Sequence, residues 1–179
     1  KIKSKYITFS GKMNYEPNKE AVIWFYKNVW LDLNKNLKNY KFKILGAHPP
    51  KELLELVQND DSVIVTGYVK SLTTELSKSK ISVAPMLSGS GMQFKILEAM
   101  SCSVPVITTP RGLGDIKARN GNEILIAETA EQFKLHIKNL IEDSEFSNKV
   151  ANNAIHFIEN NHLWKNLNKS FYEKIMFLN

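Results

Sequence analysis

Short apolar runs alternate with amphipathic segments along most of this 179-residue chain. The apolar runs are rich in Val, Ile and Phe, and most end at a glycine or proline, which is typical of buried strands. They predict six strands, at residues 5–11, 41–50, 62–69, 80–86, 104–110 and 123–128.

The segments between these runs carry apolar residues at helical spacing. In the longest of them, Pro17 stands where a helix would begin. Its apolar positions recur every four residues, at Ala21, Phe25, Val29 and Leu33. Shorter helices are predicted at 51–58, 72–79 and 91–101, and two or three helices from about residue 130 onward.

Strands that alternate with helices predict a parallel sheet covered on both faces. We therefore expect the α/β class, as one Rossmann-like three-layer α/β/α domain over residues 1–179, with a six-stranded parallel sheet and a helical C-terminal tail. Ligands of such folds bind beyond the carboxyl ends of the strands. Four predicted strands end at Gly11, Gly46, Gly67 and the Gly89–Gly91 loop, which favours a ligand cleft there, although each glycine could also serve only a turn.

Composition narrows the function classes. The net charge of +6 favours an anionic ligand or surface, but the lysines are scattered and a solvated lysine-rich surface explains them equally well. No aromatic interleaving typical of RNA binding accompanies them, so we expect no nucleic-acid partner. The single cysteine, Cys102, excludes an internal disulfide and any zinc-ligand spacing and fits a reducing, cytosolic setting. Because Cys102 lies in an apolar run, we expect a buried packing residue rather than a nucleophile.

Two further features concern membrane or secretion signals and the start of the sequence. No apolar run reaches membrane-spanning length and no signal peptide is visible. The chain begins at Lys1 rather than Met, which suggests a piece cut from a longer protein.

The stretch LSGSGMQFKILEAM, residues 87–100, is the strongest candidate for chemistry. Ser90 and Gln93 have the spacing of a capping box, so Ser90 is expected to cap the following helix. Gly89 and Gly91 flank that cap and would leave the helix N–H groups open to a phosphate. The spacing fits neither a P-loop nor a first-strand GxGxxG motif, which argues against a P-loop NTPase and a typical dinucleotide enzyme.

Two charged residues follow in the same predicted helix. Glu98 lies seven residues after Gly91 and could accept hydrogen bonds from two neighbouring ribose hydroxyls. Lys95 lies three residues before Glu98 and could add positive charge near a diphosphate. A surface Lys–Glu pair of little energetic value explains the spacing equally well.

At this point the residues resemble a known family. PMLSGSGMQFKILEAMSCSVPVITT is similar to the nucleotide-sugar-binding signature of GT-B glycosyltransferases, specifically the large retaining class called family 4. The matching parts are Pro85, the Gly89–Gly91 turn, Leu97-Glu98-Ala99-Met100 and Ser103-Val104-Pro105-Val106-Ile107-Thr108. FSGKMNYEPNKEAVIWF, KILGAHPP, IVTGYV and HLWKNLNKSFYEKI resemble other parts of the family's C-terminal domain, so the resemblance covers essentially the whole chain.

The resemblance implies a donor-binding domain whose N-terminal acceptor domain is absent. Glu98 matches the second glutamate of the family's E-x7-E motif, which holds the ribose. Lys12 and Lys95 would assist as cations, so the implied catalytic set is Lys12, Lys95 and Glu98. The implied donor-binding residues are Gly11, Gly67, Tyr68, Val69, Ser88, Gly89, Ser90, Gly91, Met92, Gln93 and Glu98.

The chain departs from the family at one position. Ser90 stands where the first glutamate of E-x7-E is expected, and that glutamate normally contacts the donor sugar. A related subgroup also has Gly-Ser-Gly here, so loss of activity does not follow. The sequence contains no Asp-x-Asp motif, and we therefore expect catalysis without a metal or other cofactor.

The resemblance also implies a substrate and a setting. The donor would be a UDP- or GDP-sugar, and the acceptor a saccharide or lipid-linked sugar in surface polysaccharide or lipopolysaccharide synthesis, in the cytoplasm or at the inner face of the membrane. Two alternatives stay open, namely a GT-B-type sugar-nucleotide epimerase and a non-catalytic nucleotide-sugar-binding module. The four histidines form no catalytic constellation, and Trp164 and Tyr172 are expected to be packing residues.

Overall fold

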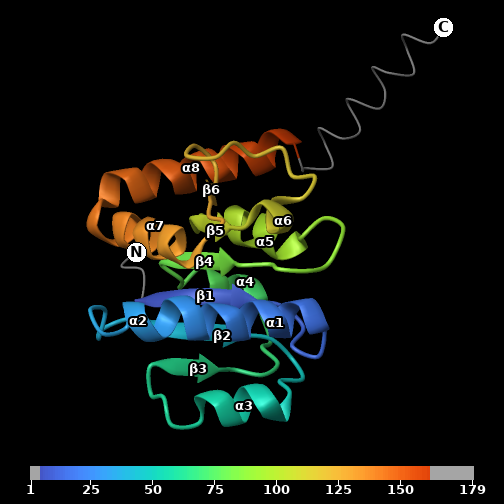
Figure 1. Ribbon diagram of the computed structural model, residues 1–179. Coiled ribbons are helices and arrows are strands. Elements are labelled where there is room, and N and C mark those ends of the chain that lie inside the picture. Colours follow the sequence, from blue (N-terminus) through green and yellow to red (C-terminus); the bar gives the residue numbers. More distant parts are fainter. Residues whose placement is uncertain (1–4, 162–179) are drawn as a thin grey trace, which may run out of the picture.

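A computed structural model describes residues 5–161 of the chain. Six parallel strands form one sheet in the order β3-β2-β1-β4-β5-β6 (Figure 1). The strands are β1 (Tyr6–Ser10), β2 (Lys41–Leu45), β3 (Val63–Val65), β4 (Ile81–Ala84), β5 (Val106–Thr108) and β6 (Leu125–Ile126). The predicted α/β class and six-stranded parallel sheet are confirmed.

Helices follow every strand of this sheet. They are α1 (Glu16–Phe25), η1 (Tyr26–Trp30), α2 (Leu31–Leu33), α3 (Lys51–Val57), α4 (Leu72–Leu76), α5 (Phe94–Ser101), α6 (Pro110–Leu113), α7 (Ala130–Glu142) and α8 (Ser144–Asn161). The first three run on from one another, with a π-helical segment, η1, in the middle (Figure 1). The predicted long helix is therefore present, and Phe25 and Val29 on its apolar face are fully buried.

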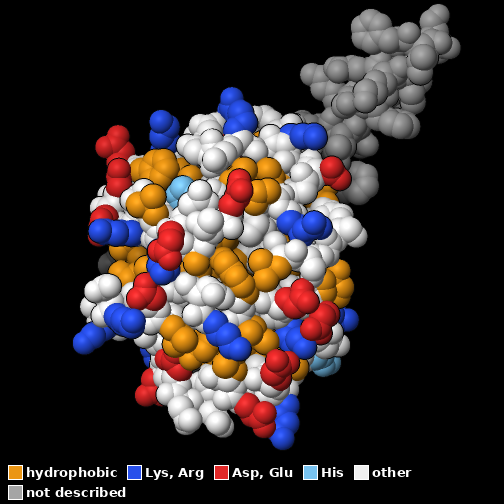
Figure 2. Space-filling model, viewed as in Figure 1, with side chains coloured by type: hydrophobic (Ala, Val, Ile, Leu, Met, Phe, Trp, Pro, Cys, Tyr) orange, Lys and Arg blue, Asp and Glu red, His pale blue; other side chains and the backbone are white. Residues whose placement is uncertain are grey.

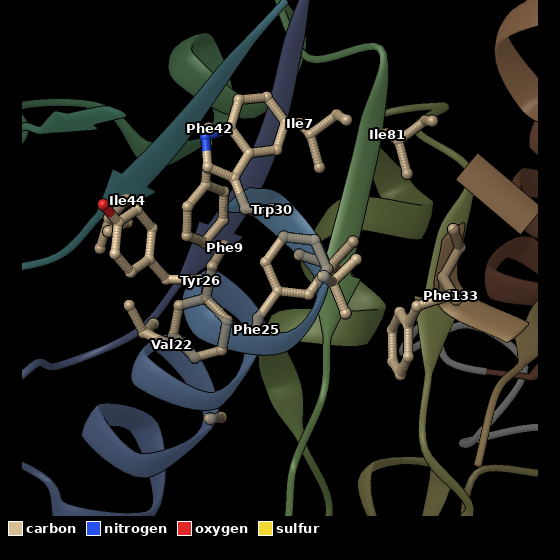
Figure 3. Close-up of a cluster of buried hydrophobic side chains, with 14 of the residues drawn as sticks. Ile7, Phe9, Val22, Phe25, Tyr26, Trp30, Phe42, Ile44, Ile81 and Phe133 are labelled. Atoms are coloured by element: carbon tan, nitrogen blue, oxygen red, sulfur yellow. The ribbon is translucent and has the colours of Figure 1, made fainter. Parts of the chain in front are cut away.

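Two apolar clusters lie on opposite faces of the sheet. One joins α1, η1 and α7 to β1 and β2, and contains Phe9, Phe25, Trp30, Phe42 and Phe133 (Figure 3). The other joins α4, α5 and α8 to β4 and β5. Helices thus cover both faces, as is usual for an all-parallel sheet, although β1 and β2 also bury the polar residues Thr8 and Lys43. This gives the three-layer arrangement that the sequence predicts.

Several boundaries differ from the sequence prediction. Each strand is shorter than predicted, and the segment 123–128 forms only the two-residue β6. The helix predicted at 91–101 begins at Phe94, and the short α6 was not predicted. Cys102 is half-buried beside the second apolar cluster. Trp164 and Tyr172 lie outside the described residues.

The surface carries mixed charge. Figure 2 shows Lys and Arg side chains interspersed with Asp and Glu over the visible face (Figure 2). Several ion pairs of the described residues join charges at helical spacing, such as Lys51–Glu55 and Lys138–Glu142. On this face the positive charge is dispersed, as the scattered lysines predict. Among residues 5–161, no helix combines the length and the apolar character needed to cross a bilayer.

Candidate functional site

The candidate site lies where the strand order reverses, at the carboxyl ends of β1 and β4. These two strands are neighbours, yet one leads through β2 to β3 and the other through β5 to β6. The connections that leave them therefore diverge to opposite faces, and open parallel sheets bind ligands at this point of the sheet edge. The β1–α1 turn and the β4–α5 loop, which carries the predicted glycines, meet at this point.

The β1–α1 turn is built around a buried amide. Asn18, in the first turns of α1, is only 4% exposed. Its Nδ2 donates to the Lys12 carbonyl at 2.9 Å. A β-carbon at Gly11 would lie 2.7 Å from that nitrogen, so the turn closes directly over the Asn18 side chain. The Lys12 side chain is exposed at the same edge of the sheet.

The β4–α5 loop lies against the start of α1. Gly89 and Gly91 have φ values of 95° and 82°, which strongly favour glycine. A β-carbon at Gly89 would meet the Pro17 ring at 3.4 Å, so the loop passes close to α1 there. Ser88 Oγ donates to Glu20 Oε2 at 2.5 Å. The loop is thus anchored to α1 before it turns into α5.

The start of α5 differs from the sequence prediction. Gln93 occupies the N-cap position, and neither its side chain nor that of Ser90 caps the helix. Ser90 is exposed, and the capping-box prediction is wrong. The positive φ of Gly91 takes the backbone off the helical path, so Ser90 lies too early in the chain to cap a helix that begins at Phe94. The first helix N–H groups consequently lack a side-chain cap at a cleft edge.

Lys95 turns inward from α5 toward α1. Its Nζ donates to Asn18 Oδ1 at 2.8 Å and to Gln93 Oε1 at 2.9 Å, with Met86 Sδ at 3.6 Å. The same atom lies 5.4 Å from the centre of the Phe9 ring. Burial lowers the pKa of Lys95 to about 8, against a smaller raising effect of Glu98. Within residues 5–161, no carboxylate forms an ion pair with this ammonium, so its charge is uncompensated at close range.

Glu98 points elsewhere. It is exposed on α5 and lines a small hollow of about 80 Å³ with Leu72 and Thr73 of α4. Because Lys95 contacts α1 and no Lys95–Glu98 ion pair forms in the described part of the chain, the alternative of a surface Lys–Glu pair is wrong. The two charges instead flank α5 on different sides, one toward β1 and one toward α4.

Three of the implied donor-binding residues, Gly67, Tyr68 and Val69, lie between β3 and α4. Gly67 has φ 67°, and a β-carbon there would meet nothing within 4 Å. Tyr68 is 79% exposed, whereas Val69 packs against the apolar cluster with Leu72. This segment therefore lies next to α4, and α4 in turn lines the small hollow together with Glu98.

A second hollow lies on the other side of the glycine loop. It has a volume of about 610 Å³ and its wall includes Ser90, Gly91, Arg111, Asp115 and Glu128. An Arg111 guanidinium nitrogen donates to the Gly89 carbonyl at 3.3 Å. Met92, just before α5, and Phe94, its first residue, are both exposed.

Sequence reasoning missed three residues that hold the site together, namely Asn18, Glu20 and Arg111. Only Asn18 leaves a signal in the sequence, as an amide in the first turns of a predicted helix, next to Pro17. Glu20 and Arg111 each act through a partner far along the chain, 68 and 22 residues away respectively. Nothing in a local pattern reveals such pairs.

Comparison with known proteins identifies the family. The sequence profile described as glycosyl transferases group 1 matches residues 4–143, most of the chain. The chain belongs to this family. The glycine loop and the Leu97-Glu98-Ala99-Met100 segment led us to expect a glycosyltransferase, and this family match confirms that expectation.

Individual relatives are more distant. An uncharacterized 44.6 kDa protein in the cps region of Klebsiella pneumoniae is 24% identical over 175 residues, which are 94% of this chain and 45% of the relative. The chain spans about half the length of the curated relatives it matches.

Solved structures of group 1 and related glycosyltransferases share the fold. The C-terminal domain of LpcC, a glycosyl transferase group 1 family protein from Francisella tularensis, superposes with a TM-score of 0.75 at 18% identity, covering 91% of this chain and 89% of that one. Anabaena HepE in complex with UDP and glucose gives a TM-score of 0.77 at 14% identity, covering 97% and 48%. The domain thus has the Rossmann-like fold of GT-B C-terminal domains.

The arrangement of possible metal ligands can be examined in the described residues. Residues 5–161 hold no group of three or more His, Cys, Asp or Glu side chains placed to bind one ion. Metal-independent catalysis stays a prediction, as do the individual roles of the donor-binding residues.

Proposed function

We propose that this chain is the donor-binding half of a retaining glycosyltransferase. It binds a nucleoside-diphosphate sugar, UDP- or GDP-linked, in the crevice between β1 and β4. In the full-length enzyme an N-terminal domain supplies the acceptor, a saccharide or lipid-linked sugar. The sugar is then transferred with retention of configuration during surface polysaccharide or lipopolysaccharide synthesis.

The observation that carries this proposal is the environment of Lys95. A cation held inside a crevice by two neutral amides, and by no carboxylate of the described residues, is costly unless an anion neutralises it. The uncapped N-terminus of α5 adds partial positive charge at the same place. Together they form an electropositive site at the edge where this fold binds ligands, which suits a diphosphate.

The remaining residues are assigned around the diphosphate. The backbone of Gly89, Ser90, Gly91 and Met92 holds phosphate or sugar oxygens, because two glycines leave it accessible. Lys12 approaches the phosphates from the β1–α1 turn. On the other side of α5, Glu98 accepts hydrogen bonds from the ribose hydroxyls, and Gly67, Tyr68 and Val69 lie along the base.

These residues would lower the barrier to sugar transfer by stabilising the leaving group. As the bond from the sugar to the diphosphate breaks, negative charge grows on the phosphate oxygens. Lys95 and the N–H groups of α5 are held in place before the reaction, and Lys12 adds positive charge from the exposed β1–α1 turn. One preorganised donor of this kind is worth about 3 kcal/mol. The proposal needs no metal, because these groups supply the positive charge.

One sequence relative and one solved structure support the substrate class. The Klebsiella pneumoniae relative lies in a cps region, and Anabaena HepE was solved with UDP and glucose. A UDP-sugar donor and a polysaccharide product are consistent with both. We place the reaction in the cytoplasm or at the inner face of the membrane, where such donors are made.

Calorimetric titration with UDP, GDP and ADP tests the proposal. Saturable binding of UDP or GDP is expected, and Glu98→Ala should weaken it by about 1–3 kcal/mol, because a charge-assisted hydrogen bond to the ribose is lost. Glu142→Ala, a surface carboxylate on α7, is the control and should leave affinity unchanged. Equal affinity in wild type and Glu98→Ala would reject the assignment of Glu98.

Ser90 keeps one rival function open, that of a binding module without catalysis. The full-length protein distinguishes the two. Transfer of sugar from the bound donor to an acceptor supports the enzyme, whereas nucleotide-sugar binding without transfer or donor hydrolysis supports the module.

A further inference from the structure

We propose that Asn18 is a positioning residue that holds the Lys95 ammonium over the carboxyl end of β1 while leaving its charge free for the diphosphate. The inference rests on the proposed function for the role of Lys95. Asn18 itself belongs to neither the glycine loop nor the LEAM segment, and it reaches the phosphate only through Lys95.

The orientation of the Asn18 amide is fixed by two opposite partners. Its Nδ2 donates to the Lys12 carbonyl at 2.9 Å, and its Oδ1 accepts from Lys95 Nζ at 2.8 Å. A flipped amide would set Nδ2 against an ammonium and Oδ1 against a carbonyl, and both contacts would repel. The Lys12 carbonyl therefore determines that the Asn18 oxygen faces Lys95.

The surroundings prevent the amide from leaving this position. Asn18 is buried, and the Gly11 backbone packs so closely on it that a β-carbon at Gly11 would lie 2.7 Å from Nδ2. The two ends of the crevice are thus joined through one side chain. The β1–α1 turn carries Lys12, α5 carries Lys95, and Asn18 fixes one relative to the other.

An amide suits this role better than a carboxylate. In the part of the chain that the structure describes, the Lys95 ammonium contacts Phe9 of β1, Asn18 of α1 and Met86 after β4, and all three side chains are neutral. Gln93, which lies two residues before Lys95, is also neutral. Glu98 is charged, and its electrostatic attraction raises the pKa of Lys95, but less than burial lowers it. Aspartate at position 18 would form an ion pair with Lys95 and cancel the charge meant for phosphate.

The first test needs no nucleotide. The Lys95 ammonium is titrated by NMR in ligand-free wild type and in Asn18→Asp. A carboxylate beside the ammonium stabilises its charged form, so the pKa of Lys95 should rise clearly above the wild-type value. Asn28→Asp adds the same charge at an exposed position further along the same helical run and is the matched control. An unchanged Lys95 titration in folded Asn18→Asp would overturn the proposal.

The second test is a double-mutant cycle on UDP affinity, using Asn18→Asp, Lys95→Met and the double variant. Asn18→Asp should weaken UDP binding about tenfold in the wild-type background. In the Lys95→Met background it should cost less than about twofold, since Asn18 acts through Lys95. An equal loss in both backgrounds would mean that Asn18 only supports the fold.

Asn18→Ala serves if Asn18→Asp does not fold. It removes the acceptor without adding charge, and the same cycle with Lys95→Met applies. The two proposals fail separately. A wild-type chain that binds no nucleotide rejects the proposed function even if Asn18→Asp moves the Lys95 titration, whereas UDP binding with an unmoved titration rejects the role of Asn18 alone.

Discussion

Two lysines of this domain each lie over an aromatic ring of β1, yet their partners differ. Lys43 of β2 lies 4.7 Å from the Tyr6 ring centre and forms an ion pair with Glu75 of α4 at 2.5 Å. Lys95 lies 5.4 Å from the Phe9 ring centre and contacts neutral amides. The first charge is compensated within the fold, whereas the second has only neutral hydrogen-bond partners among the described residues.

The difference shows how burial alone misleads. Lys43 is the more buried of the two, but its carboxylate partner makes it part of the structure. Glu75 in turn has its pKa lowered by hydrogen bonds from Lys43 and then Lys78. A buried lysine points to a ligand only when the fold leaves its charge unpaired, as at Lys95.

The largest effect is expected from breaking the structural pair. Glu75→Gln leaves Lys43 buried without its counter-charge and should lower the free energy of unfolding by about 3 kcal/mol. Denaturant unfolding measures this, and UDP affinity should stay within about twofold. Lys78→Met removes only the exposed partner of Glu75 and should cost less than about 1 kcal/mol. A Glu75→Gln protein as stable as wild type would show that the pair is not structural.

Acid should act on the same pair. The pKa of Glu75 is lowered in the folded state, so its stabilising contribution is present above the ordinary value of 4.5 and is lost as pH falls through the folded value. Wild type should therefore lose more stability below pH 4.5 than Glu75→Gln does. Equal acid sensitivity of the two proteins would contradict the lowered pKa.

Removing Lys95 should affect UDP affinity more than stability, the reverse of what we expect for Glu75→Gln. If the proposed function holds, Lys95→Met removes a positive charge from beside the diphosphate and should weaken UDP binding by about 1.5–3 kcal/mol, roughly 10- to 100-fold. Its stability at pH 7 should change much less than that of Glu75→Gln, because no ion pair is broken. A large loss of stability with unchanged affinity would make Lys95 a structural residue like Lys43.

Alkaline pH separates the two lysines further. Burial lowers the pKa of Lys95 in the folded chain to about 8, whereas its ordinary pKa of 10.5 applies in the unfolded chain. Between these values the unfolded state binds more protons, so this group makes stability rise with pH. The stability difference between wild type and Lys95→Met should therefore shift in favour of wild type from pH 8 to 10.5. A pH-independent difference would contradict the lowered pKa.

The smallest effect concerns the anchor of the glycine loop. Ser88→Ala removes the hydrogen bond to Glu20 and should weaken UDP binding by about 0.5–1.5 kcal/mol, because the loop is less well held against α1. Ser77→Ala, which removes an exposed hydroxyl at the C-terminal end of α4 and its hydrogen bond to the Thr74 carbonyl, is the control. Equal affinities in both variants would leave the loop anchored by its backbone alone.

The comparison also explains what the sequence could predict. Alternating apolar runs predicted the sheet, and LSGSGMQFKILEAM pointed to the cleft, because both are local patterns. The partner of Lys43 lies 32 residues away and that of Lys95 lies 77 residues away, so neither pairing could be predicted locally. Ser90 was placed in a capping box because spacing alone does not reveal the positive φ of Gly91, which delays the helix to Phe94.

The most direct test of the account is to follow backbone amide shifts during titration with UDP and GDP. The account predicts saturable shifts concentrated at Gly11–Lys12 and at Gly89–Lys95, with little change around Lys43 and Glu75. Saturable shifts centred instead on another part of the surface, such as the polar hollow between Arg119 and Asn153, would contradict it. Absence of shifts with either nucleotide would contradict it as well.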